Sequence, residues 1–287
     1  MLKIVPAVLF LGAAAFVSTS NLRDARADAA AKSRVVTVRA TEFAFDIPKS
    51  IPAGPTTFRL INNGKEFHHL SIIKLEQGKT AADFGEAMKG GPPPEWAVAV
   101  GGPNAAMPGQ TIAATIDMGP GNYVVVCFIP SPGEKAPHAA KGMVAPLTVT
   151  AGGVAQAGGA AAETIEDPKP DLHLVMKEYG YQFSKPVTAG KHTIHVMNEG
   201  TQDHEAVMLR MNPGKRITDF NEWVSSDMKG PPPATTIDGL AGMAPGRTAT
   251  FTADFKPGTY AIICFVGDKN DGKSHAEHGM TVEFEVK

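Results

Sequence analysis

The chain has 287 residues, of which 43% are hydrophobic and 20% are charged, and its formal net charge is −2. This composition indicates a folded globular protein rather than a disordered one, and the length predicts about two domains. The 27 basic and 29 acidic side chains nearly balance. They give no excess of positive charge of the kind that nucleic-acid binding needs, so we expect no nucleic acid as a partner.

The first 27 residues have the features of a secretory signal peptide. Lys3 precedes an apolar run from Ile4 to Val17, and Ala25-Arg26-Ala27 has the small-residue pattern of a cleavage site. An uncleaved anchor is the alternative, but the run is shorter than the ~20 residues that span a bilayer. We therefore expect a periplasmic or secreted, mildly acidic protein without a membrane span after removal of the signal.

The rest of the chain contains an internal repeat. Glu42-Phe43-Ala44-Phe45 returns 136 positions later as Glu178-Tyr179-Gly180-Tyr181, and Gly121-Asn122-Tyr123 returns 137 positions later as Gly258-Thr259-Tyr260. Such a period predicts two homologous domains. We place them at residues 34–150 and 169–287, and call them the first and the second repeat.

Short apolar segments bounded by turn residues run through the first repeat, and they have the length and composition of β-strands. They are Val35 to Arg39, Thr56 to Ile61, Leu70 to Leu75, Thr111 to Ile116, Tyr123 to Phe128 and Pro146 to Thr150. Strands of this kind without long helices between them indicate an antiparallel β-sandwich.

Each repeat also has one segment that predicts a short helix, near Thr80 to Met88 in the first and near Ile217 to Met228 in the second. A Gly-Pro-Pro-Pro run follows each segment and cannot continue a helix. We expect this helical insert to cover one end of the sandwich.

Residues 151–168 form the predicted linker. It opens with AGGVAQAGGAAAE and runs into the prolines of EDPKP. Small residues without apolar periodicity predict a flexible tether, and the prolines stiffen its end. We therefore expect the two repeats to fold separately, at a distance that the tether leaves open.

The motif that carries the chemistry is built on the two cysteines. Each is followed by a histidine eleven residues on and a methionine five residues after that, so the spacing C-x10-H-x4-M occurs twice. With one upstream histidine, each repeat supplies two imidazoles, one thiolate and one thioether, the ligand set of a mononuclear blue-copper site. Zinc also binds a Cys-His-His set, but it has little use for a thioether. The predicted ligands are His68, Cys127, His138 and Met143 in the first repeat and His204, Cys264, His275 and Met280 in the second.

The repeat decides which upstream histidine is the ligand. Phe67-His68-His69 aligns with Asp203-His204-Glu205, so His68 is the equivalent of His204. Its neighbour His69 is expected on the opposite face of the strand, at the surface. We expect the other histidines to be ordinary or solvated positions; they are His173, His192, His195 and His278.

An even number of cysteines in a secreted protein usually suggests a disulfide. Cys127 and Cys264 occupy equivalent positions of two domains, which would hold their sulfur atoms too far apart to bridge. We therefore expect two free thiols.

On these residues each repeat resembles a cupredoxin, the plastocyanin and azurin class. The resemblance lies in the Gly-x-Tyr-x-x-x-Cys strand, the His-x4-Met tail and the single upstream histidine, and it covers nearly all of both repeats. It is nearest to secreted cupredoxin-like proteins with a His…Gly-Met ending. The resemblance implies an all-β chain of two tandem Greek-key β-sandwiches with up to two type 1 copper ions, each bound near one end of its sandwich.

Two features depart from the well-studied members of the class. Ten residues separate each cysteine from its histidine, where those members have a shorter loop. His69 and Glu205 follow the upstream histidines, where those members usually have an Asn or Ser that hydrogen-bonds the thiolate. A change in such a partner alters the affinity for the metal and its potential.

Two-domain nitrite reductases and laccases are also built from tandem cupredoxin units, but they need a second copper site. Its histidines flank the cysteine or form His-x-His pairs. Here Val126 and Phe128 flank Cys127, and none of the nine histidines forms a His-x-His pair. We therefore expect no oxidase or reductase activity.

The sequence thus predicts a one-electron carrier whose partners are periplasmic or membrane-attached redox proteins. Two alternatives share the fold. One is a copper-binding or copper-buffering module without electron transfer, and the other is a metal-free sandwich that binds a partner.

Overall fold

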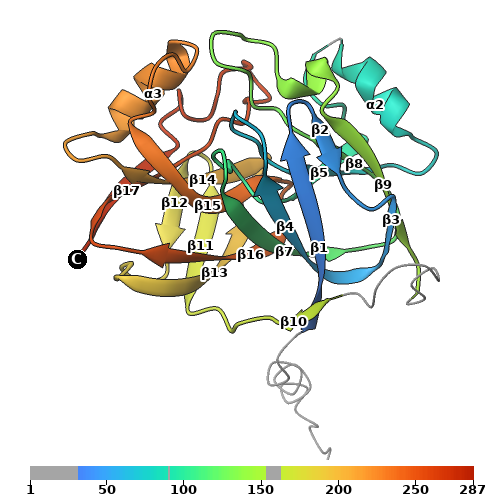
Figure 1. Ribbon diagram of the computed structural model, residues 1–287, viewed down its shortest axis with the longest axis horizontal. Helices are drawn as coiled ribbons and strands as arrows, with labels where there is room; N and C mark the ends of the chain where they lie inside the picture. The colour runs from blue at the N-terminus through green and yellow to red at the C-terminus, as the bar shows by residue number, and fades with distance from the viewer. Residues whose placement is uncertain (1–31, 90, 153–162) are drawn as a thin grey trace, which may run out of the picture. The chain divides into compact units, whose positions relative to one another are not determined.

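The protein is described here by a computed structural model, in which residues 32–89, 91–152 and 163–287 are described. The predicted signal peptide and residues 153–162 of the predicted linker lie outside these ranges. Residues 31–287 form one compact unit, and β-strands make up most of its regular structure (Figure 1). No helix in the described part of the chain is long and apolar enough to cross a membrane.

Nine strands form the first sheet, and they come from both repeats. In spatial order they are β10 (Thr164–Glu166), β1 (Lys32–Thr41), β4 (Gly54–Asn62), β7 (Thr111–Met118), β16 (Thr248–Phe255), β13 (Gly190–Asn198), β11 (Leu172–Lys177) and β12 (Gly180–Phe183), with β2 (Ala44–Asp46) paired to β1. The last residues of the predicted linker thus form β10, which pairs with β1 of the first repeat.

The second sheet also has nine strands and also crosses from one repeat to the other. In spatial order they are β18 (Thr281–Val286), β17 (Gly258–Ile263), β14 (His204–Met211), β15 (Ala234–Met243), β6 (Ala97–Gly101), β5 (Ser71–Leu75), β8 (Gly121–Val126), β9 (Val144–Thr150) and β3 (Ser50–Pro52). Each strand segment expected from the sequence of the first repeat corresponds to a strand of these sheets, but Leu70, Cys127 and Phe128 lie just outside β5 and β8.

The sheets are mixed, whereas the sequence predicted antiparallel ones. β1 pairs with β4, β11 with β13, and β3 with β9 in parallel. Parallel neighbours need a crossover connection rather than a hairpin. Between β1 and β4 the chain supplies one, because it leaves the first sheet to place β3 beside β9 in the second.

Strand pairs in both sheets join the two repeats. Thr115 and Ala114 of β7 face Thr250 and Phe251 of β16, and Met243 of β15 faces Val100 of β6. These pairings make each sheet continuous across the repeat boundary, an arrangement that the linker composition did not predict.

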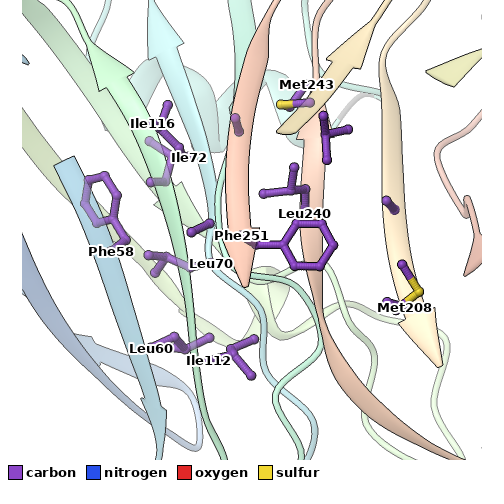
Figure 2. Packing of buried hydrophobic residues seen from close by; sticks show 14 of the residues in the cluster. Phe58, Leu60, Leu70, Ile72, Ile112, Ile116, Met208, Leu240, Met243 and Phe251 are labelled. Atoms are coloured by element: carbon purple, nitrogen blue, oxygen red, sulfur yellow. The ribbon is translucent and has the colours of Figure 1, made fainter. Parts of the chain in front are cut away.

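One hydrophobic core lies between the sheets and draws on both repeats, which makes the fold a β-sandwich (Figure 2). Phe58 of β4 and Ile72 of β5 belong to it, and so do Leu240 of β15 and Phe251 of β16. All four are at most 2% exposed. Full burial of side chains of this size stabilises a fold by about 1.5–3 kcal/mol each, so this core links the stability of the two repeats.

The two expected helices are present as α2 (Ala81–Met88) and α3 (Ile217–Ser225), and α3 ends three residues earlier than predicted. Thr80 caps α2, since its hydroxyl accepts from the Asp83 amide while the Asp83 carboxylate accepts from the Thr80 amide. Each helix buries one phenylalanine side chain, Phe84 in α2 and Phe220 in α3.

Two glycines at the repeat boundary are required by close backbone contacts. Gly102 has φ +140°, and a Cβ there would overlap the carbonyl oxygen of Leu70. Gly239 has φ +142°, and a Cβ there would overlap the carbonyl oxygen of Ala206. The carbonyl of Gly102 also accepts a hydrogen bond from Ala241 of the other repeat, at 2.8 Å.

We predict that Gly102→Ala destabilises the protein more than Gly54→Ala does. Gly54 has φ +119° with open space around the added methyl group, so its substitution should cost only the backbone strain of about 1–3 kcal/mol. Gly102→Ala adds the overlap with Leu70. Urea unfolding of the metal-free variants measures both losses, and equal losses would contradict the packing argument.

Candidate metal centres

In the first repeat, three fully buried side chains converge at one end of the strands. Cys127 directly follows β8, His138 begins the 3-10 helix η1 (His138–Lys141), and His68 lies before β5 in a backbone bridge with Ala106. The two Nδ1 atoms lie 3.2 Å apart. The sulfur of Cys127 lies 3.4 Å from Nδ1 of His138 and 4.0 Å from Nδ1 of His68.

The second repeat has the same arrangement. His204 begins β14, Cys264 directly follows β17, and all three side chains are fully buried. Nδ1 of His204 lies 3.0 Å from Nδ1 of His275, which in turn lies 3.4 Å from the sulfur of Cys264. In each repeat the three candidate ligand atoms lie within 4.8 Å of one another. Both cysteines are free thiols.

Backbone hydrogen bonds explain how a ten-residue loop returns the histidine to the cysteine. In the first repeat the amide of His138 donates to Ile129 at 2.9 Å, and Ala139 donates to Cys127 at 2.9 Å. The residues between them turn back on themselves through a bridge of Pro130 with Pro137. The second repeat forms the equivalent bonds and a bridge of Gly267 with Ser274, so the extra length is taken up in a small outward loop.

The donor atoms fit a bound metal ion. The three distances of the first cluster leave a point in their plane about 2.1 Å from each atom, close to the roughly 2.0–2.3 Å of metal bonds to imidazole and thiolate. Two imidazoles and one thiolate form the trigonal set of blue-copper sites. This donor set stands at the same positions in both repeats of an all-β sandwich. In its all-β fold and in both donor sets the chain resembles two tandem cupredoxin units.

Solved copper proteins are similar to parts of the chain at low TM-scores. The auracyanin of Roseiflexus castenholzii is 26% identical, covering 41% of this chain and 98% of its own, with a TM-score of 0.29. An azurin of Methylomonas sp. strain J is 14% identical, covering 41% and 98%, with a TM-score of 0.29. The copper nitrite reductase of Nitrosomonas europaea is 16% identical, covering 89% and 94%, with a TM-score of 0.26. No family model and no curated protein matches the chain. The assignment therefore rests on the repeated clusters.

The two predicted methionine ligands lie beside the cysteines along the backbone. The amide of Cys127 donates to the carbonyl of Met143 at 3.2 Å, and that of Cys264 donates to Met280 at 3.3 Å. Both methionines are fully buried in the same core cluster as the cysteines. Axial coordination by their sulfur atoms stays a prediction.

A carboxylate stands at the outer nitrogen of every histidine in the cupredoxin-like clusters. Nε2 of His138 lies 2.9 Å from Glu66, and Nε2 of His204 lies 3.3 Å from Glu178. The other two contacts are longer: His68 to Glu42 at 3.6 Å and His275 to Asp268 at 3.8 Å. Among the described residues, these last two Nε2 atoms are buried without a hydrogen bond. Carboxylates at this position fix the tautomer and orientation of metal-bound imidazoles.

Backbone amides hold two of these carboxylates in place. Glu42 accepts from the amides of Lys65 and Glu66, and Glu178 accepts from those of Thr201 and Gln202. Burial opposes ionisation of Glu178, but the amide hydrogen bonds outweigh it and lower its pKa to about 2. Glu42 and Glu178 open the repeated segment Glu-aromatic-x-aromatic, so the sequence contained a signal for them.

Burial sets the protonation state of the metal-free clusters. It lowers the pKa of His68 and of His275 to about 4, with help from the facing histidine of each cluster, and it lowers the pKa of His138 and of His204 as well. Burial raises the pKa of Cys127 to about 12 and that of Cys264 further. At pH 7 the imidazoles are therefore neutral, with lone pairs ready for a metal, and the thiols are protonated.

We predict that metal binding releases about one proton per site at pH 7, because the thiol must ionise while the histidines are already neutral. Affinity should then rise about tenfold per pH unit around neutrality, and fall more steeply below about pH 4, where His68 and His275 take up protons. Calorimetric titration with Cu(II) in buffers of different ionisation enthalpy measures the release. A value near zero would mean that the thiols are ionised without metal.

We also predict that Glu66→Gln weakens Cu(II) binding at the first cluster by about tenfold to a hundredfold, the usual effect of removing such a partner. The measurement uses a Cys264→Ser background, so that only the first cluster binds. Glu163→Gln is the matched control, because Glu163 is exposed and pairs with Arg59 instead. Equal effects of the two substitutions would contradict a role for Glu66.

The residue after each upstream histidine has a position that the sequence did not predict. His69, expected at the surface, is 6% exposed, and Glu205 is 7% exposed. His69 Nε2 accepts the amide of Phe128, and Glu205 Oε1 accepts the amide of Phe265, both at 2.8 Å. Each side chain therefore holds the residue that follows the cysteine rather than the sulfur.

Backbone amides also approach both sulfur atoms. The amide of Glu205 lies 3.5 Å from the sulfur of Cys264, and the amides of His69 and Ile129 act on the thiol of Cys127, where they oppose the effect of burial on its pKa.

The other histidines lie outside the two clusters. His173 and His195 face each other on β11 and β13 with ring centres 5.7 Å apart, and His192 bonds Asp171. His278 is partly exposed and bonds Asp271 at 3.1 Å; with Asp268 these form a third, acidic group. No sequence pattern indicates Glu66 or Asp268, because their contacts arise only from the folded loops.

Proposed function

We propose that the protein binds copper at both clusters and acts as a one-electron carrier in the periplasm or outside the cell. The observation that carries the proposal is the pair of fully buried His-Cys-His clusters, whose donor atoms are already gathered around a common point. Copper bound there would supply a one-electron couple, since two imidazoles, a thiolate and a weak thioether suit both oxidation states.

The protein's own residues keep the donor set fixed. The loop bonds from His138 and Ala139 back to Ile129 and Cys127 set the distance between imidazole and thiolate. The carboxylate of Glu66 orients the imidazole of His138 from its outer side. A donor set held in this way changes little when an electron arrives or leaves, which favours rapid exchange with redox proteins of the same compartment.

Burial favours an electron carrier over a copper-buffering module. A buffer has to take up and release its metal, which requires a path for the ion to the ligands. The six histidine and cysteine side chains of the clusters are all 0% exposed. An electron can pass through the covering side chains, whereas an ion needs the loop to open.

We propose carrier activity rather than oxidase or reductase activity. Phe128 and Phe265 follow the cysteines at the positions where a histidine would reach a second copper. In the ranges that the structure describes, the third group of potential ligands contains one histidine, His278, and two carboxylates, and it is partly exposed. Such a group does not match the histidine-rich second site of the copper enzymes.

We predict that Cu(II) added to the mature protein gives an intense visible thiolate-to-copper absorption band with two ions bound per chain. Cys127→Ser and Cys264→Ser should each remove about half of the band, because each removes one of two equivalent thiolates. Copper analysis and absorption spectroscopy on the same samples check this. A wild-type protein without the band would support the metal-free alternative.

The carrier and the buffer differ in kinetics. A carrier should be bleached by ascorbate and recoloured by an oxidant over repeated cycles without losing copper. Loss of copper to a chelator on the same time scale as reduction would favour buffering.

A further inference from the structure

Three buried polar side chains meet at the boundary between the two repeats. His69, Asn104 and Glu205 are 6%, 1% and 7% exposed, and they line a cavity of about 570 Å³ together with Phe128 and Phe265. Polar groups in such a place destabilise a fold unless they are paired. Here they are paired with one another, across the boundary between the repeats.

These side chains form a continuous chain of hydrogen bonds. The amide of Phe128 donates to Nε2 of His69 at 2.8 Å, and Nδ1 of His69 lies 3.2 Å from Oδ1 of Asn104. Nδ2 of Asn104 donates to Oε2 of Glu205 at 3.0 Å, and Oε1 of Glu205 accepts from the amide of Phe265 at 2.8 Å. Phe128 follows Cys127 and Phe265 follows Cys264. The chain of hydrogen bonds therefore begins and ends at the backbone amide of the residue next to a cluster cysteine.

The partners determine where the protons lie. Nε2 of His69 accepts from Phe128, so the ring proton is on Nδ1 and is donated to the amide oxygen of Asn104. The amide nitrogen of Asn104 then faces Glu205 and also donates to the carbonyl of Leu240 at 3.1 Å. Every donor in this chain of hydrogen bonds therefore has an acceptor.

The chain of hydrogen bonds is asymmetric, although the two repeats are alike. His69 and Glu205 occupy equivalent positions, yet one is an imidazole and the other a carboxylic acid. The alignment of Met107-Pro108-Gly109 with Ala244-Pro245-Gly246 makes Ala241 the equivalent of Asn104. Alanine has no polar side-chain atom, so the amide of Asn104 makes the contacts to both repeats. Its oxygen accepts from His69 and its nitrogen donates to Glu205, so one amide connects a donor with an acceptor.

We propose that His69, Asn104 and Glu205 form an internal path by which an electron passes between the two metal centres. The proposal rests on the proposed copper binding. With copper bound at both clusters, one electron would pass from Cu(I) at one cluster to Cu(II) at the other, and no bond would be broken and no proton transferred. Covalent and hydrogen bonds conduct an electron better than gaps do, and this path contains four hydrogen bonds and otherwise covalent bonds.

A second side chain contact across the boundary offers a matched control. Nε2 of Gln110 donates to the carbonyl of Thr236 at 2.9 Å, and the hydroxyl of Thr236 donates back at 3.1 Å. This contact also joins the repeats through an amide side chain, but it leads to neither Phe128 nor Phe265. Gln110→Leu therefore tests the effect of losing an amide contact between the repeats without cutting the path.

The first measurement needs no metal. In the metal-free protein, Asn104→Leu should shift the NMR amide resonances of both Phe128 and Phe265, because the chain connects them through His69 and Glu205. Gln110→Leu should leave both in place. The path would be overturned if Asn104→Leu left these two amide resonances in place, or if Gln110→Leu shifted them as much as Asn104→Leu does.

The second measurement follows the electron in the copper-loaded protein. A Met280→Gln background replaces the predicted axial ligand of the second site and should make its absorption band distinguishable. After pulse reduction with less than one electron per chain, the two bands should relax toward equilibrium at a rate independent of protein concentration. Asn104→Leu should slow this phase about tenfold, which corresponds to ~1.4 kcal/mol in activation free energy, while Gln110→Leu should leave it within about twofold of the parent.

The outcomes separate this inference from the proposed function. A parent protein without a copper band would refute copper binding itself. Normal bands with an unchanged relaxation in Asn104→Leu, or no concentration-independent phase in the parent, would overturn the path alone. If Asn104→Leu does not fold, Asn104→Ala cuts the same two hydrogen bonds with a smaller side chain, and the same result is expected of it.

Discussion

The structure of both sites depends on the backbone hydrogen bonds that fold the loop after each cysteine back onto the end of its strand. In the first repeat the amides of His138 and Ala139 bond Ile129 and Cys127, and the second repeat forms the same pair of bonds. These bonds place an imidazole beside a thiol. The ten intervening residues turn back on themselves through a bridge of Pro130 with Pro137 in the first repeat and of Gly267 with Ser274 in the second.

Burial then gives the clusters their chemistry. The same desolvation that keeps the imidazoles neutral keeps the thiols protonated, so a metal that binds replaces a proton at sulfur and meets ready lone pairs at nitrogen. Carboxylates such as Glu66 lie on the outer side of the rings, where they orient the imidazoles without occupying the metal position. Stability and metal binding thus depend on the same packed core.

Because both sheets contain strands of both repeats, the two similar sites belong to one folded unit. Strand pairs across the boundary, such as Ala114 with Phe251, fix one repeat against the other. That fixed boundary allows a buried amide, Asn104, to reach polar side chains of both halves. His69 and Glu205 follow the two upstream histidines, and each accepts a hydrogen bond from the backbone amide of the residue after a cysteine. One is an imidazole and the other a carboxylic acid, because the amide of Asn104 between them accepts a hydrogen bond on one side and donates one on the other.

The sequence by itself predicted the two His-Cys-His groups, the repeat, the two short helices and the strands, because these follow from local spacing and from the periodicity of apolar residues. It also indicated two free thiols, which the structure has. It predicted His69 at the surface and antiparallel sheets, and both were wrong, because burial and strand direction depend on which distant segments meet. Asn104 and Glu205 are 101 positions apart, and neither has a sequence neighbour that signals the contact. Only the tertiary structure, which brings such residues together across a shared sheet, decided that the two sites are connected.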